Sequence, residues 1–150
     1  MGQLALPTSG LVYLDASPII YSVEKISPYQ EIMQPLWLAA QSGSFGLIGS
    51  ELLILETLVK PIQNQDRILE ATFRQILTAS RELQLVPITA NVLERATQLR
   101  ATFGIKTPDA IHAATALIYG CTLFVTNDPG FRRVTDLKIA ILQEIVKSPH

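Results

Sequence analysis

The chain contains 150 residues, 48% hydrophobic and 17% charged, so it has the size of one ordinary domain and is too apolar for an intrinsically disordered protein. Twelve Lys and Arg residues against thirteen Asp and Glu residues give a net charge of −1, which disfavours a protein that coats nucleic acid through bulk positive charge. A single cysteine, Cys121, excludes an internal disulfide framework and a zinc cluster built on cysteines.

The first half of the chain opens with residues 1–10, which have no basic residue ahead of a long apolar stretch and do not resemble a secretory signal. Residues 11–15 form a short apolar run, typical of a strand buried on both faces. Ser17 and Pro18 predict the start of a helix, with Ser17 as its N-cap. The patterns that follow predict a helix over 29–41, a strand over 45–50, and helices over 51–59 and 66–79.

The second half continues this alternation, with predicted strands over 83–89, 122–126 and, as a possible fifth, 138–145, and predicted helices over 91–103 and 107–120. Asn91 is the expected cap of the first of these helices, and Thr107 with Pro108 opens the second. Residues 110–127 carry no charge, but Gly120 divides them into a helix and a strand, each shorter than the roughly 20 residues of a membrane span. We expect a cytoplasmic protein that does not enter a membrane.

Strands that alternate with helices predict an α/β fold of three layers, in which a central, mostly parallel sheet of four to five strands is flanked by helices. We expect residues 1–150 to form this fold as a single domain. In such sheets the functional crevice lies outside the carboxyl ends of the strands. Polar residues that follow a strand or open the next helix are therefore the candidates for function.

Three aspartates lie at such positions. Asp15 ends the first strand, and the following helix does not need it as a cap, because Ser17 and Pro18 already open that helix. Asp109 lies in the first turn of a helix, where an acid also stabilises the helix dipole. Asp128 follows the fourth strand in an Asn-Asp-Pro-Gly segment that is also ordinary turn chemistry. Asp109 and Asp128 thus each have a structural alternative to a functional role.

A fourth acid, Glu56, lies in an otherwise apolar helical run, with Leu52 at i−4 and Val59 at i+3. A carboxylate beside an apolar face needs a partner, a metal ion or a proton. Lys60, at i+4, offers the alternative of a helical ion pair. Glu51 lies nearer the end of the preceding strand, and the residues alone do not separate it from Glu56 as the functional acid.

Four carboxylates that converge on one crevice suit a hard divalent cation, which takes oxygen ligands and leaves room for water and substrate phosphates. Mg²⁺ or Mn²⁺ held in this way can generate a hydroxide nucleophile and stabilise the charge that develops on a phosphodiester. We therefore treat Asp15, Glu56, Asp109 and Asp128 as the candidate metal-binding and catalytic residues.

The candidate acids lie in four segments: Tyr-Leu-Asp-Ala-Ser at 13–17, Ser-Glu-Leu-Leu-Ile-Leu-Glu at 50–56, Lys-Thr-Pro-Asp-Ala-Ile-His at 106–112 and Phe-Val-Thr-Asn-Asp at 124–128. These segments resemble PIN-domain proteins, in particular the VapC-type toxin ribonucleases of prokaryotic toxin–antitoxin pairs. Their order and spacing cover nearly the whole chain, and the last two are the most specific. By this resemblance the family's metal-site acids fall on Asp15, Glu56, Asp109 and Asp128. Ser17, Thr126 and Asn127 match polar positions that support the site.

The resemblance implies dependence on Mg²⁺ or Mn²⁺, cleavage of RNA to leave a 5′-phosphate and a 3′-hydroxyl, an antitoxin partner and a homodimer. Two features depart from it. Residues 16–18 read Ala-Ser-Pro where many relatives have Thr/Ser-Asn-Val, which weakens the expected polar support around Asp15. The family's toxins are also frequently basic, and this chain is not. Contacts to RNA would then come from a local rim, for which the candidates are Lys60, Lys106, Arg132 and Arg133.

The leading hypothesis is a metal-dependent endoribonuclease, the toxin of a toxin–antitoxin pair. The alternative is a catalytically inactive PIN-like module that binds RNA or serves as a regulatory scaffold. An aspartyl-phosphate phosphatase is disfavoured, because that chemistry uses a second Asp two residues after the first, where this chain has Ser17. His112 lies three residues after Asp109 on the same helical face, and we interpret it as a core or supporting residue.

Overall fold

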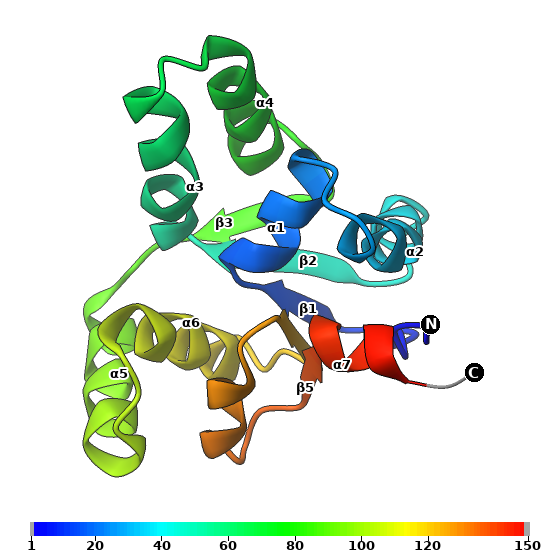
Figure 1. The fold of residues 1–150 in the computed structure, drawn as a ribbon. Helices are drawn as coiled ribbons and strands as arrows, with labels where there is room; N and C mark the ends of the chain where they lie inside the picture. Colours follow the sequence, from blue (N-terminus) through cyan, green and yellow to red (C-terminus); the bar gives the residue numbers. More distant parts are fainter. Residues whose placement is uncertain (1, 149–150) are drawn as a thin grey trace.

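The computed structural model describes residues 2–148 and is built on one sheet of parallel strands (Figure 1). The strand order is β3-β2-β1-β4-β5, and every neighbouring pair is parallel. The strands are β1 (Leu11–Leu14), β2 (Gly46–Ser50), β3 (Leu83–Val86), β4 (Leu123–Thr126) and β5 (Ile139–Ile141). β1 occupies the centre, as its short apolar run predicts for a strand buried on both faces.

Helices connect these strands, because parallel neighbours need a crossover. They are α1 (Ala16–Val23), α2 (Tyr29–Gln41), α3 (Leu52–Gln63), α4 (Arg67–Thr78), α5 (Ala90–Phe103), α6 (Thr107–Ile118), the 3-10 helix η1 (Pro129–Arg133) and α7 (Leu142–Lys147). One apolar core joins the sheet to α1, α2, α3, α4 and α7, and includes Ile19 and Phe73. A second core joins it to α5, α6 and η1, and includes Val92 and Phe131. The predicted three-layer α/β/α fold is confirmed.

The alternation of side chains along the strands decides which face each polar strand-end residue joins. In β1, Val12 and Leu14 lie in the first core and Tyr13 in the second, the one that contains α5 and α6. Asp15, two residues after Tyr13, continues on the α6 side. In β4 the same alternation sends Phe124 to the second core, and Thr126 follows it.

The connections make the gap between β1 and β4 the point where the strand order changes direction. From β1 the chain proceeds to β2 and β3 on one side, and it then returns to add β4 and β5 on the other. In open parallel sheets the ligand crevice lies at such a switch point, outside the carboxyl ends of the strands. Asp15 follows β1 and Asp128 follows β4, so both acids flank it.

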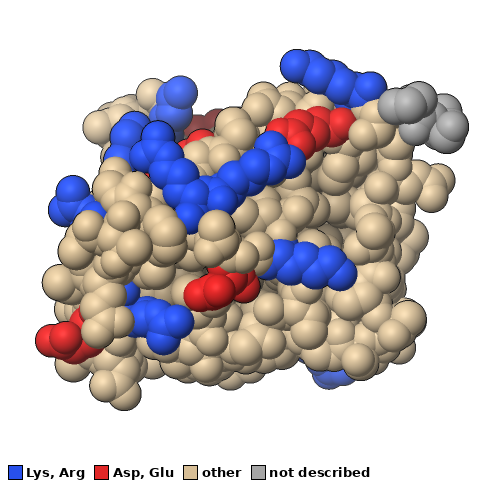
Figure 2. Space-filling view, turned by 90° about the horizontal axis from the view of Figure 1, so that it is seen from below, with Lys and Arg blue, Asp and Glu red and all other residues tan. Residues whose placement is uncertain are grey.

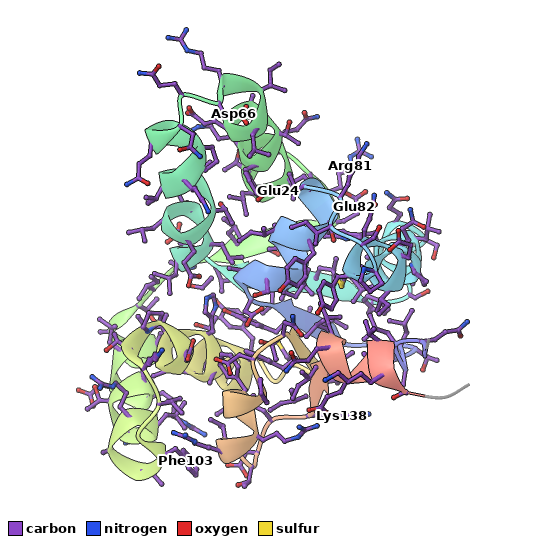
Figure 3. All side chains as sticks on the ribbon, in the orientation of Figure 1. Glu24, Asp66, Arg81, Glu82, Phe103 and Lys138 are labelled. Carbon is purple, nitrogen blue, oxygen red and sulfur yellow. The ribbon has the colours of Figure 1, made fainter. Side chains whose placement is uncertain are left out.

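Figure 1 shows α3 and α4 at the top of the view, beyond β3, and α5 and α6 at the bottom. The carboxyl ends of the central strands lie between these two pairs of helices. Figure 3 shows Asp66 in the turn between α3 and α4, and Phe103 at the end of α5, far apart on opposite sides of the molecule. The first described residues lie beside α7 near the end of the described chain (Figure 1), where the Gly2 backbone N–H donates to the Ile145 carbonyl at 3.0 Å. No helix within residues 2–148 is long and apolar enough to cross a membrane.

The prediction of one strand over 138–145 is wrong, because β5 ends at Ile141 and α7 begins at Leu142. The side-chain carbonyl of Asn127 accepts the backbone N–H of Gln143 at 2.8 Å and so satisfies an amide in the first turn of α7. This cap comes from a residue 16 positions earlier, and no local pattern announces it.

Helix starts also differ from the prediction by one or two residues. The cap of α5 is Thr89, whose hydroxyl accepts the Val92 N–H at 3.2 Å, rather than Asn91. Ser17 lies inside the first turn of α1 and is not its cap; Asp15 holds the N-cap position without making a side-chain capping bond. β3 ends at Val86 rather than residue 89, before Pro87, which has no N–H for the ladder.

Gly49 allows α3 to pack directly against the end of β2. A Cβ at this position would collide with the Leu53 side chain, which is fully buried, and would lie 3.3 Å from the backbone oxygen of Leu14. The absence of a side chain therefore lets the first turn of α3 approach the sheet, and this approach determines where the rest of the helix lies.

We expect Gly49→Ala to lower the free energy of unfolding by about 1–3 kcal/mol, because neither the buried side chain nor the backbone can yield freely. Urea denaturation measures the change. Gly46→Ala is the matched control in the same strand, where the added Cβ meets only the end of the Leu11 side chain, at 2.9 Å. Equal losses in the two variants would contradict this account of the α3 contact.

Candidate active site at the carboxyl ends of the strands

Asp15 is buried, with 7% of its surface exposed, where β1 ends. Its Oδ2 accepts a hydrogen bond of 2.5 Å from the Thr126 hydroxyl, and that hydroxyl oxygen accepts the Asp128 backbone N–H at 3.0 Å. Its other oxygen, Oδ1, is buried and has no hydrogen-bond partner within residues 2–148. Since buried polar atoms are nearly always paired, the unpartnered oxygen marks a position suited to a ligand.

Burial raises the pKa of Asp15 to about 7 from its ordinary 3.8. His112 and the Thr126 hydrogen bond oppose this rise, whereas the carboxylates of Glu56 and Asp109 add to it. The pKa of Asp15 is raised because a carboxylate charge is costly to hold away from water and near other negative charges. A cation beside Oδ1 would favour the ionised form.

Glu56 is half-buried on α3, and its Oε1 lies 2.6 Å from Nε2 of His112 on α6. The other ring nitrogen, Nδ1, lies 2.6 Å from the hydroxyl of Tyr13 on β1. Three elements are thus joined by one buried chain of polar groups. Glu51 is exposed before α3 and has no side-chain hydrogen bond within the described residues, so the site geometry includes Glu56 instead.

Asp109 and Asp128 lie together at a hollow of about 230 Å³ whose lining also includes Lys106 and Arg133. Burial and then the charge of Asp128 raise the pKa of Asp109, while His112 and Lys106 lower it. Asp128 also has the turn role considered above, because its Oδ1 accepts the Gly130 N–H at 2.8 Å. The two roles are compatible, since this bond uses only one of its carboxylate oxygens.

The four acids influence one another through space. Glu56 and Asp109 each raise the pKa of Asp15, and Asp128 and Glu56 each raise that of Asp109. Between residues 2 and 148, however, no three His, Cys, Asp or Glu side chains are close enough to enclose a metal ion directly. Mg²⁺ does not require that, because it keeps several waters and binds through one or two carboxylates. The unpartnered oxygen of Asp15 among coupled carboxylates fits such an ion.

The remaining predicted site residues fall into two groups. Thr126 contacts Asp15, and Lys106 and Arg133 line the hollow beside Asp109. The others are directed elsewhere. Asn127 donates to the Tyr21 hydroxyl at 2.9 Å and caps α7, and Arg132 forms a bidentate pair with Glu144. Ser17 makes no side-chain hydrogen bond in the described part of the chain, and Lys60 is exposed on α3.

The sequence does not predict Tyr13 as a site residue, and it predicts His112 only as a core or supporting residue. The structure places His112 in contact with a candidate ligand and Tyr13 behind it. Two sequence signals were available. Tyr13 shares the strand face of Asp15, and His112 shares the helix face of Asp109. Neither spacing reveals that the two side chains meet, 99 residues apart in the chain.

The chain matches the PIN domain family over residues 12–137 and belongs to that family. No curated protein matches it in sequence. The fold is similar to VapBC2 from Rickettsia felis bound to a promoter DNA fragment, with a TM-score of 0.69 and 16% identity over 87% of this chain and 98% of the other.

Two further solved structures share the fold. One is VapBC-1 from nontypeable Haemophilus influenzae, with a TM-score of 0.62 and 17% identity over 89% of this chain and 98% of the other. The other is VapC20 from Mycobacterium tuberculosis, a toxin that cleaves the sarcin–ricin loop, with a TM-score of 0.62 and 16% identity over 75% of this chain and 86% of that one.

The raised pKa of Asp15 predicts how the stability of the metal-free protein depends on pH. The folded protein keeps a proton on Asp15 up to about pH 7, whereas the unfolded chain releases it near 3.8. The free energy of unfolding should therefore fall as pH rises between these values, by a few kcal/mol at about 1.4 kcal/mol per pH unit. Urea denaturation at several pH values measures this.

Asp15→Asn should flatten the fall, because the amide has no proton to release. Asp136→Asn, at an exposed position, is the matched control and should retain it. An unchanged pH dependence in Asp15→Asn would show that Asp15 is not the group responsible.

Proposed function

We propose that this protein is a metal-dependent endoribonuclease that hydrolyses RNA phosphodiester bonds and is the toxin of a toxin–antitoxin pair. Membership of the PIN domain family supports the nuclease chemistry. The observation that carries the proposal is the buried, unpartnered oxygen of Asp15 at the switch point of the sheet, with three further acids around it. A toxin of this kind acts on cellular RNA, which places it in the cytoplasm.

In this proposal Asp15, Glu56, Asp109 and Asp128 hold Mg²⁺ or Mn²⁺, directly or through water. The bound ion supplies a water of lowered pKa as nucleophile and positive charge for the phosphodiester transition state. The chain's own contribution is to hold the carboxylates in place. Thr126 orients Asp15 by donating to Oδ2, and the turn closed by the Gly130 N–H orients Asp128.

The positive groups nearest the acids are the proposed contacts to the RNA backbone. Lys106 and Arg133 share a hollow with Asp109 and Asp128, so a phosphate there would lie between the cations and the metal-binding acids. Figure 2 looks onto the face that is lowest in Figure 1, and there Lys and Arg side chains form a band and cover more surface than Asp and Glu. This face is locally basic although the chain as a whole is not.

We also propose an antitoxin as a partner, because two of the similar structures named above are of VapBC proteins, and a second copy of this chain as another. The chain has exposed apolar surface for such contacts. On α3, Leu55, Val59 and Ile62 are exposed, and Ile68 at the start of α4 is more exposed still. Leu55, Val59 and Ile62 line one hollow, and apolar residues gathered in this way are typical of a protein–protein contact.

RNA cleavage tests the proposed chemistry. With total RNA, including tRNA, we expect discrete products in Mg²⁺ or Mn²⁺ and none with a chelator. Asp109→Asn and Glu56→Gln should each lower the rate by roughly 100-fold or more, because each removes a charge that supports the metal ion. Glu24→Gln is the matched control, since Glu24 follows the end of α1 remote from Asp15 (Figure 3).

Two results would overturn this proposal. Cleavage that persists in chelator, or at the wild-type rate in Asp109→Asn, would exclude the metal centre. Binding of RNA without cleavage in either metal, unchanged in Asp109→Asn, would support the alternative of an inactive PIN-like module.

The phosphate contacts can be tested with Lys106→Gln and Arg133→Gln. Each variant should raise KM for RNA several-fold and reduce the dependence of binding on salt, by about 0.7 in the slope of log K against log salt per lost phosphate contact. Arg132→Gln is the matched control, because this neighbouring residue is paired with Glu144 and does not line the hollow. Equal effects in Arg132→Gln would contradict the proposal that Lys106 and Arg133 contact phosphate specifically.

A further inference from the structure

His112 is a buried titratable side chain, 2% exposed, to which the proposed chemistry gives no role. Its ring has polar partners on both sides at the same distance: the Tyr13 hydroxyl is 2.6 Å from Nδ1, and Glu56 Oε1 is 2.6 Å from Nε2. Tyr13 is itself held by packing. Its ring stacks on Phe124 at 5.0 Å between centroids and meets the His112 ring edge-on at 5.7 Å. The chain of contacts therefore begins on a rigid strand.

The direction of these hydrogen bonds follows from which groups carry protons. A neutral imidazole has one N–H donor and one acceptor nitrogen. The Tyr13 hydroxyl is a phenol, which keeps its proton at neutral pH and can therefore donate to Nδ1, 2.6 Å away. The ring proton then lies on Nε2 and points at Glu56. The other tautomer would set the Nε2 lone pair against a carboxylate oxygen 2.6 Å away.

We propose that Tyr13 and His112 are positioning residues that orient Glu56 for metal binding, through hydrogen bonds that run from the Tyr13 O–H to Nδ1 and from Nε2–H to Glu56 Oε1. This inference rests on the proposed function, in which Glu56 is a metal ligand. The chain uses one carboxylate oxygen and leaves Oε2 without a hydrogen bond within residues 2–148, free for an ion or its water. A histidine N–H that fixes a ligating carboxylate has the role of an outer-shell partner.

Glu56 needs such a restraint because of where it lies. It extends from α3, a helix that packs at the β3 edge, and its side chain is 24% exposed. An unrestrained glutamate could rotate toward water and away from the negative charges of Asp15 and Asp109, which it faces. The hydrogen bond from His112 to Oε1 holds the carboxylate on their side.

The tautomer of His112 in the metal-free protein tests this directly. The chain has two histidines, so ¹⁵N-histidine labelling yields two rings in NMR, and His150→Gln assigns them. We expect His112 to be protonated at Nε2 alone. In Tyr13→Phe, which keeps the packing but loses the donor to Nδ1, the Nδ1–H form should appear beside it. A wild-type ring protonated at Nδ1, or at both nitrogens, would overturn the proposal.

Calorimetric titration of the metal-free protein with Mn²⁺ tests the consequence for Glu56. His112→Asn cannot reach Glu56 and should weaken Mn²⁺ binding roughly 10- to 100-fold. His112→Gln can place an amide N–H near the position of Nε2 and should restore most of the affinity. Tyr13→Phe should weaken it about 2- to 10-fold, as expected for one lost neutral hydrogen bond.

Thr115→Val is the matched control for packing within α6. Thr115 is as buried as His112, lies one turn further along the helix, and its hydroxyl bonds only to the Ile111 carbonyl. It should leave Mn²⁺ binding unchanged. Equal weakening in His112→Asn, His112→Gln and Thr115→Val would mean that His112 acts through packing alone, and would refute the positioning role.

These measurements also separate this inference from the proposed function. The tautomer is observed without metal or RNA. Wild-type protein that binds no Mn²⁺, or cuts no RNA, would contradict the proposed function whatever the tautomer. A wrong tautomer in a protein that does both would contradict only the positioning role of Tyr13 and His112.

Discussion

The burial of Asp15 at the end of the central strand is the constraint on which the candidate site depends. A carboxylate there is costly to ionise, and its pKa of about 7 expresses that cost. Its surroundings offset the cost in part: Thr126 donates to one oxygen, and His112 lowers the pKa. The other oxygen has no partner among residues 2–148. In the proposed function a divalent cation supplies the missing partner, so a locally unfavourable feature of the apo protein becomes the basis of its chemistry.

Strand order explains why residues from distant segments meet at this point. β1 pairs in parallel with both β2 and β4, so the residues that follow these three strands all lie at the carboxyl-terminal end of the sheet. Asp15 follows β1 directly, α3 with Glu56 follows β2, and Asp128 follows β4. Helix α6 crosses the same region from the other layer and adds Asp109 in its first turn. The parallel fold thus gathers acids that are up to 113 residues apart in the chain.

Charge is distributed locally in a way that net charge conceals. The chain has a net charge of −1, yet four of its thirteen acids lie around the switch point while Lys106 and Arg133 line the adjoining hollow. Arg132 and Glu144 neutralise each other on the surface, so two adjacent arginines have different environments. A nuclease needs this arrangement, because the metal-binding acids repel the phosphates that the substrate must bring near them.

The sequence by itself determined the fold class, the positions of the main strands and the three candidate aspartates, because hydrophobic period, caps and strand-end positions are local properties. It also identified Thr126, which contacts Asp15. It did not separate Glu56 from Glu51, extended β5 into α7, and assigned Asn127 to the site although that side chain caps α7. Only the tertiary structure decided these points and joined Tyr13, His112 and Glu56. The reason is that a hydrogen bond between side chains tens of residues apart depends on how layers pack, which no local pattern encodes.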